Sequence, residues 1–214
     1  MNFGETLTYW YLRLNGFLPI TNFVLHKGVH IDRTADADIL AVRFPGVYEE
    51  IGGQPKDWDT QAFEAWGINL ETDIVGLIVE VKTGYENNPH KLAEGINRAF
   101  GVERLILGAQ RLGFWDLHKA EQVGCELAER SIYRETAFRL EAENTTRDFV
   151  LAKMLASTSL PNGYEIPDCI TMPLHHIKNF IDKRIGEYVD RKYADRMNFP
   201  SDLMQYLIWS RKNL

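Results

Sequence analysis

A helical repeat of apolar residues marks the start of the chain. It comprises Phe3, Leu7, Trp10, Tyr11, Leu14 and Leu18. Asn2 and Glu5 have the spacing of a helix-capping pair, and Asn15-Gly16 is a typical helix end. The pattern therefore predicts an N-terminal helix that is covered by protein on most of its circumference.

Four apolar runs and one further helical pattern follow. The runs at 21–27, 35–44, 73–84 and 103–110 are each short and rich in strand-forming or aliphatic residues, which predicts four strands. The run at 73–84 has almost no polar interruption and is typical of a central strand. Between the last two runs, a helix is predicted over 88–101. The order helix, three strands, helix, strand predicts an α/β sandwich.

The remaining segments complete a single domain over residues 1–214. Residues 46–72 form an insertion with six acidic residues and one lysine, and its aromatic residues predict an ordered element. Residues 117–131 are predicted to be helical, whereas the pattern over 132–157 fits strand and helix equally. Two amphipathic helices are predicted in a C-terminal extension over about 170–214.

Composition and charge narrow the class of protein. Hydrophobic content of 45% and charged content of 25% are typical of a soluble globular protein. No apolar run approaches the roughly 20 residues of a membrane span, and no signal peptide is visible, so we expect a cytoplasmic protein without a membrane partner. Cys125 and Cys169 are expected to be free thiols. A net charge of −6 disfavours simple nonspecific nucleic-acid binding.

The candidate chemistry lies at the end of the central run. Side chains alternate along a strand, so Glu80 and Lys82 share one face, and Asp38 shares a face with Asp36 on the preceding strand. If these strands are neighbours, Asp38, Glu80 and Lys82 form one patch. Two carboxylates suit a hard divalent cation such as Mg²⁺, and a lysine beside them can orient or help deprotonate a water.

These residues carry a resemblance to a known family. The Asp38-Ile39-Leu40 strand, the Glu80-Val81-Lys82 strand, and the helices on either side resemble the PD-(D/E)XK nuclease superfamily over roughly residues 1–114. Two features depart from the family pattern. Ala37 precedes Asp38 where the family often has proline, and the acidic insertion places about forty residues between the two halves of the motif.

The resemblance implies a fold, a site and a reaction. The fold would be a restriction-endonuclease-like sandwich, in which helices flank a central mixed β-sheet. Asp38 and Glu80 would hold Mg²⁺ or Mn²⁺ with the Val81 carbonyl, Lys82 would serve the attacking water, and Glu5 would match an auxiliary ligand. The protein would hydrolyse phosphodiester bonds of a nucleic acid, most naturally DNA, as a homodimer.

Three further residues are candidates for substrate binding. Lys91 and Arg98 lie on the polar side of the helix predicted at 88–101, and Gln110 ends the run at 103–110. A solvated helix face explains Lys91 and Arg98 as well as substrate contact does.

Other interpretations remain open at this point. The protein can be a catalytically inactive nuclease-fold subunit of a defence or repair complex, whose acidic insertion contacts a basic protein partner. It can also be an unrelated α/β binding protein in which Glu80 and Lys82 form a structural ion pair. Glu5 also fits a simple capping acid. His175 and His176 diverge by about 100° on a helix, which favours surface or capping roles over a shared metal.

Overall fold

The order of elements is that of an α/β protein. The structure, a computed structural model, describes residues 1–23, 37–49, 52–84, 89–140, 145–158, 168–188 and 202–213. Its elements in chain order are α1 (Phe3–Leu14), β1 (Leu18–Phe23), β2 (Ala37–Arg43), a 3₁₀ turn (Pro55–Asp57), α2 (Thr60–Ala65), β3 (Ile74–Lys82), α3 (Pro89–Ala99), α4 (Val102–Leu112), α5 (Leu117–Ala128), β4 (Ile132–Leu140), β5 (Thr145–Ser157), β6 (Ile170–Pro173), α6 (Leu174–Tyr188) and α7 (Asp202–Asn213).

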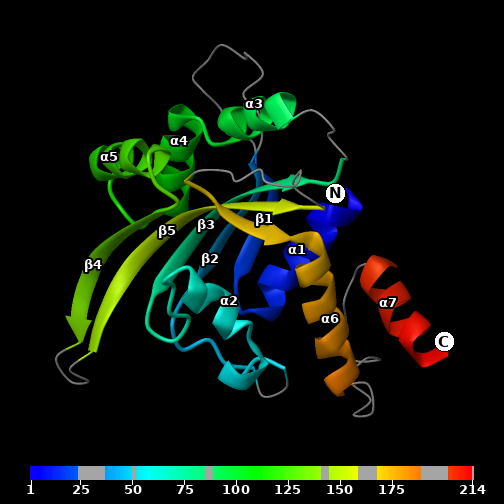
Figure 1. Ribbon diagram of the computed structural model, residues 1–214. Coiled ribbons are helices and arrows are strands. Elements are labelled where there is room, and N and C mark those ends of the chain that lie inside the picture. The colour runs from blue at the N-terminus through cyan, green and yellow to red at the C-terminus, as the bar shows by residue number, and fades with distance from the viewer. Residues whose placement is uncertain are drawn as a thin grey trace.

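The sheet is mixed and open, and helices lie on both of its faces. Five of its six strands have the order β1-β2-β3-β5-β4. The sixth strand, β6, pairs with the C-terminal end of β5. β1, β2 and β3 form an antiparallel meander, whereas β3 and β5 are parallel. Figure 1 shows α4 and α5 on one side of the sheet and α1 and α6 on the other. The predicted α/β class is confirmed.

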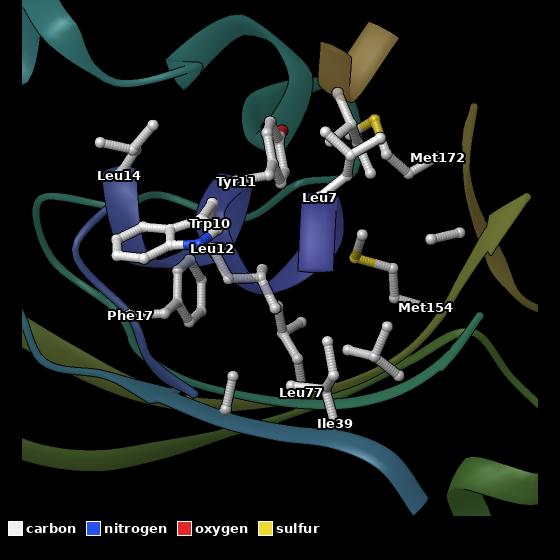
Figure 2. Packing of buried hydrophobic residues seen from close by; sticks show 14 of the residues in the cluster. Leu7, Trp10, Tyr11, Leu12, Leu14, Phe17, Ile39, Leu77, Met154 and Met172 are labelled. Atoms are coloured by element: carbon white, nitrogen blue, oxygen red, sulfur yellow. The ribbon is translucent and has the colours of Figure 1, made fainter. Parts of the chain in front are cut away.

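Two hydrophobic clusters fill the spaces between the layers. The larger cluster lies under α1 and α6, where Tyr11, Leu12 and Phe17 are fully buried (Figure 2). The smaller cluster lies under α3, α4 and α5 and includes Leu40 and Ile78 from the sheet. β3 contributes to both clusters, so the prediction that it is a central strand is confirmed.

α1 begins and ends where the sequence predicts. The Asn2 side chain accepts a hydrogen bond from the Glu5 N–H at 3.0 Å, and the Glu5 carboxylate accepts one from the Asn2 N–H at 3.1 Å. This reciprocal capping box satisfies two main-chain donors that a helix N-terminus leaves without partners. The C-cap is Asn15, and Gly16 follows with a φ of 80°.

The strand predicted over 103–110 is wrong. These residues lie in α4, where Leu105, Gly108 and Ala109 are buried at helical spacing. The strand beside β3 is instead β5, from the region 132–157 whose pattern fitted both states. Buried positions three and four residues apart are the pattern of a helix, and here this spacing outweighs the aliphatic content that suggested a strand.

The insertion and the C-terminal extension are ordered where the structure describes them. Trp58 and Phe63 of the insertion are buried, as the prediction of an ordered element requires. The predicted helices at 88–101, at 117–131 and in the C-terminal extension correspond to α3, α5, α6 and α7. Within the described ranges, no helix is both long enough and apolar enough to span a membrane.

Arg43 at the end of β2 ties the insertion to the sheet. Its side chain is fully buried, its Nε donates to the Asn15 carbonyl at 2.9 Å, and its Nη1 donates to the Leu70 carbonyl. The guanidinium also lies 4.3 Å from the centroid of the Trp58 ring. Burial lowers the pKa of Arg43 to about 10, so the side chain stays charged at neutral pH.

Candidate active site

Asp38 meets β3 at the point where the pairing of β2 with β3 ends. The antiparallel register runs from Arg43 opposite Val75 to Ile39 opposite Val79. Immediately beyond it, the Asp38 Oδ2 accepts a hydrogen bond from the Val81 N–H at 2.7 Å. The Asp38 side chain thus replaces the main-chain acceptor that a continuing β2 would offer to β3. If the register is extended by one residue beyond Ile39, Asp38 lies across from Glu80.

The side chains of the predicted site share a face of the sheet. Val79 and Val81 belong to the cluster under α1, so alternation directs Glu80 and Lys82 away from that cluster. Leu40 belongs to the opposite cluster, and Asp38, two residues earlier on the same strand, shares its face. The chain therefore brings Asp38, Glu80 and Lys82 together, as the sequence predicts.

Glu80 and Lys82 form an ion pair through Glu80 Oε1 and Lys82 Nζ. The Glu80 side chain is 10% exposed, whereas the Lys82 side chain is 35% exposed. The amine is therefore the more accessible member of the pair.

The surroundings of Asp38 disfavour the charged form of its carboxyl group. Burial, together with the nearby Glu80 carboxylate, raises the pKa of Asp38 from 3.8 to about 6. The hydrogen bond from Val81 and the charge of Lys82 oppose this shift but do not cancel it. Two carboxylates that share a partly buried site favour a proton or a cation between them.

Glu5 lies near this site but is engaged elsewhere. Its carboxylate accepts hydrogen bonds from Asn2, including one from the Asn2 Nδ2 at 2.6 Å. Its charge still contributes to raising the pKa of Asp38. The first turn of α1 packs closely against the end of β3. A Cβ added to Gly4 would lie only 2.2 Å from the Thr83 Cγ2. The capping role expected for Glu5 is thus present.

The donors at the site fit a hard divalent cation. Among the described residues, Asp38 and Glu80 each use one oxygen for a protein contact, so their second oxygens are the candidates for a ligand. The N–H and C=O of one strand residue point to the same side, so the Val81 carbonyl also points toward β2. Among the described residues, no group of three or more His, Cys, Asp and Glu side chains could hold a metal. Water and substrate oxygens would complete the shell, as is usual for Mg²⁺.

Two of the candidate substrate-binding residues, Arg98 and Gln110, lie on the helices α3 and α4. Arg98 is exposed on α3, and its carbonyl accepts a hydrogen bond from Arg104. Gln110 lies in the last turn of α4, not at the end of a strand, because the segment is helical. The side chain of Lys91 and all of Asp36 lie outside the described residues.

Two groups of residues escaped the sequence reasoning. Ser157, at the end of β5, pairs with Lys82, and the Thr158 N–H donates to the Lys82 carbonyl at 3.1 Å. The second group joins Tyr11, Asp59 and His176, and the Asp59 carboxylate is its centre. No spacing rule signals these contacts, because their members lie far apart in the sequence.

Comparison with known proteins adds no assignment. The chain matches no protein-family model, and searches of curated proteins and of solved structures found no significant match.

Proposed function

We propose that the protein is a metal-dependent nuclease of the PD-(D/E)XK type that hydrolyses phosphodiester bonds of DNA. The observation that carries the proposal is the convergence of Asp38, Glu80 and Lys82 where β2 and β3 part. Burial, and after it the charge of Glu80, raises the pKa of Asp38, as expected for two neighbouring carboxylates at a partly buried position.

The order of elements supports the proposal. The superfamily core consists of a helix, three strands, a helix and a strand, with the acidic and lysine residues on the second and third strands. Here α1 is followed by the meander β1-β2-β3. The chain then passes through α3, α4, α5 and the strand β4 before it reaches β5, which is parallel to β3. This chain also has β4, which pairs with β5 at the edge of the sheet.

The roles of the residues follow from their positions. Asp38 and Glu80 would hold the cation through their second oxygens, together with the Val81 carbonyl. When bound, such a cation lowers the pKa of a coordinated water and offsets negative charge on the phosphate. Lys82 is the accessible member of its ion pair, so its amine can hold the attacking water in line with the phosphorus.

The raised pKa of Asp38 sets the pH range in which we expect the site to bind a metal ion. Below about pH 6 the free carboxyl group is protonated and is a poor metal ligand. Because metal binding competes with the proton, we expect the cation requirement to increase steeply as the pH falls below about 6.

The test is a cleavage assay with Mg²⁺ or Mn²⁺ on linear, circular, branched and single-stranded DNA and on RNA. We expect metal-dependent cleavage by the wild type and none by Asp38→Ala or Lys82→Ala. Lys178→Ala is the matched control, because Lys178 forms an exposed ion pair with Asp182 on α6. Cleavage of equal rate by Lys82→Ala and the wild type would remove the lysine from the mechanism. No cleavage of any substrate would refute the nuclease proposal.

A second function is favoured by one observation. The Lys82–Glu80 pair and the Val81–Asp38 hydrogen bond give both carboxylates a protein partner without a cation, as an inactive nuclease-fold subunit would require. Its expected acidic docking surface is reduced, because Asp57 is buried and Asp59 contacts Tyr11. Calorimetric titration with Mg²⁺ separates the two: an enzyme loses metal binding on Asp38→Ala, whereas a subunit shows none in either protein.

A further inference from the structure

An apolar groove of about 420 Å³ lies at the β1 edge of the sheet, beside the last turns of α1 and α4. Within the sheet, β1 is an edge strand. Leu18 pairs with Val42, and Ile20 pairs with Leu40. Because residues directly opposite each other on antiparallel strands share a face, these four aliphatic side chains form the floor of the groove. Its volume is within the range of roughly 300–1,000 Å³ that is typical of small-molecule sites.

The groove gathers large apolar side chains that are exposed. Leu18 is 59% exposed and Ile20 is 56% exposed, and Phe44, which also lines the groove, is 49% exposed. Single exposed apolar residues are common on protein surfaces, whereas a contiguous group of them marks an interaction site. The groove is therefore a candidate binding surface.

The charged residues that line the groove, among those that the structure describes, are Arg13 and Arg111. Arg13 lies 3.2 Å from Glu49, which is outside the lining and offsets its charge. Arg111 is exposed in the last turn of α4, and its guanidinium lies 5.7 Å from the centroid of the Phe23 ring. It forms no ion pair with any described residue. The groove thus offers one positive charge without an acidic partner beside an apolar floor.

The extent of the groove and the sequence of β1 favour a small ligand over a protein chain. Eleven residues line the groove, whereas a stable protein interface engages about 20–30 residues on each side. β1 also contains Pro19, and proline on an edge strand discourages the addition of a further strand. One guanidinium matches a single carboxylate through paired N–H donors, and the aliphatic floor matches an unbranched hydrocarbon.

We propose that this groove binds an aliphatic monocarboxylate, a fatty acid of medium chain length, with the hydrocarbon along Leu18 and Ile20 and the carboxylate at Arg111. The groove shares no residue with the Asp38–Glu80–Lys82 site, and the proposal does not depend on nuclease activity.

The test is isothermal titration of the full chain at pH 8, in EDTA so that no metal contributes. The ligands are hexanoate, octanoate and decanoate, with octan-1-ol as the neutral comparison. Octanoate should bind saturably and about fivefold more tightly than octan-1-ol, because only the carboxylate pairs with a guanidinium. Each added CH₂ should strengthen binding about two- to fourfold, so decanoate should bind at least about tenfold more tightly than hexanoate.

Two variants separate the charge from the apolar floor. Arg111→Gln should lower the affinity for octanoate to that for octan-1-ol and leave octan-1-ol binding unchanged. A basic residue in the last turn of a helix also offsets the helix dipole, but loss of that role would not distinguish the two ligands. Ile20→Ser should weaken the binding of both. Both substituted side chains are exposed, and Lys178→Ala, outside the groove, should bind like the wild type.

Any of three results would overturn the proposal. They are the absence of saturable binding by octanoate and decanoate, equal affinity for octanoate and octan-1-ol, and equal binding of octanoate by the wild type and Arg111→Gln. Loss of octanoate binding in Asp38→Ala would move the ligand to the site on β2 and β3 and would also refute the assignment. Retained binding in Asp38→Ala, alongside any result of the cleavage assay, keeps this proposal distinct from the nuclease proposal.

Discussion

Replacing Asp38 by Asn should stabilise the protein at pH 8 while abolishing metal-dependent activity. The pKa of Asp38 rises from 3.8 to about 6 because the carboxylate is partly buried beside Glu80. A shift of about two units corresponds to about 3 kcal/mol of unfavourable free energy for the charged form. Solvent screening reduces this figure because the group is incompletely buried, which leaves an expected gain of about 1–2 kcal/mol.

The gain should depend on pH in a defined direction. The folded protein binds the Asp38 proton more tightly than the unfolded chain does, so wild-type stability from this group increases as the pH falls from about 6 to about 4. The advantage of Asp38→Asn is therefore complete above about pH 6 and disappears near pH 4. The Asn side-chain oxygen can still accept the hydrogen bond from Val81, so the variant removes the charge and keeps the contact.

The assay is urea denaturation at pH 8 and at pH 4, each with and without Mg²⁺. We expect Mg²⁺ to stabilise the wild type at pH 8 and to leave Asp38→Asn unchanged, since a ligand stabilises only a state that binds it. Asp182→Asn, which removes an exposed ion pair with Lys178, is the control and should change stability by less than about 1 kcal/mol. A loss of stability in Asp38→Asn at pH 8, or an equal effect at both pH values, would refute the electrostatic reasoning.

Three other substitutions test the fold and the site. Lys82→Ala should leave the circular dichroism spectrum and the unfolding midpoint near those of the wild type while cleavage is lost; a large drop in the midpoint would make the lysine structural. Arg43→Met should destabilise the protein by about 3 kcal/mol in urea, since it leaves two buried carbonyls without their donor; an unchanged midpoint would contradict that role. Gly4→Ala should also destabilise, by about 1–3 kcal/mol, because its Cβ would lie 2.2 Å from Thr83; wild-type stability would show that α1 can shift without cost.

Local patterns were sufficient for much of the fold. The capping pair at Asn2 and Glu5 and the glycine after Asn15 fixed both ends of α1, because these signals act within a few residues. The continuous apolar run of β3 revealed a strand buried on both faces. Local signals were insufficient at 103–110, where the aliphatic content suggested a strand and the burial of one side selected a helix.

The candidate site was predictable in part for the same reason. Glu80 and Lys82 share a face by alternation alone, which needs no tertiary information. Their meeting with Asp38 required β2 and β3 to be neighbours, which the sequence could only suggest, and the Val81 hydrogen bond depends on where that pairing ends.

By itself, the sequence determined the α/β class, the central strand and the shared face of Glu80 and Lys82, since all three follow from periodicity along one segment. Only the tertiary structure decided that β5 lies beside β3, that Tyr11, Asp59 and His176 meet, and that an apolar groove lies at the β1 edge of the sheet. Contacts between distant segments depend on how whole elements pack, and the burial that selects them is a property of the assembled layers.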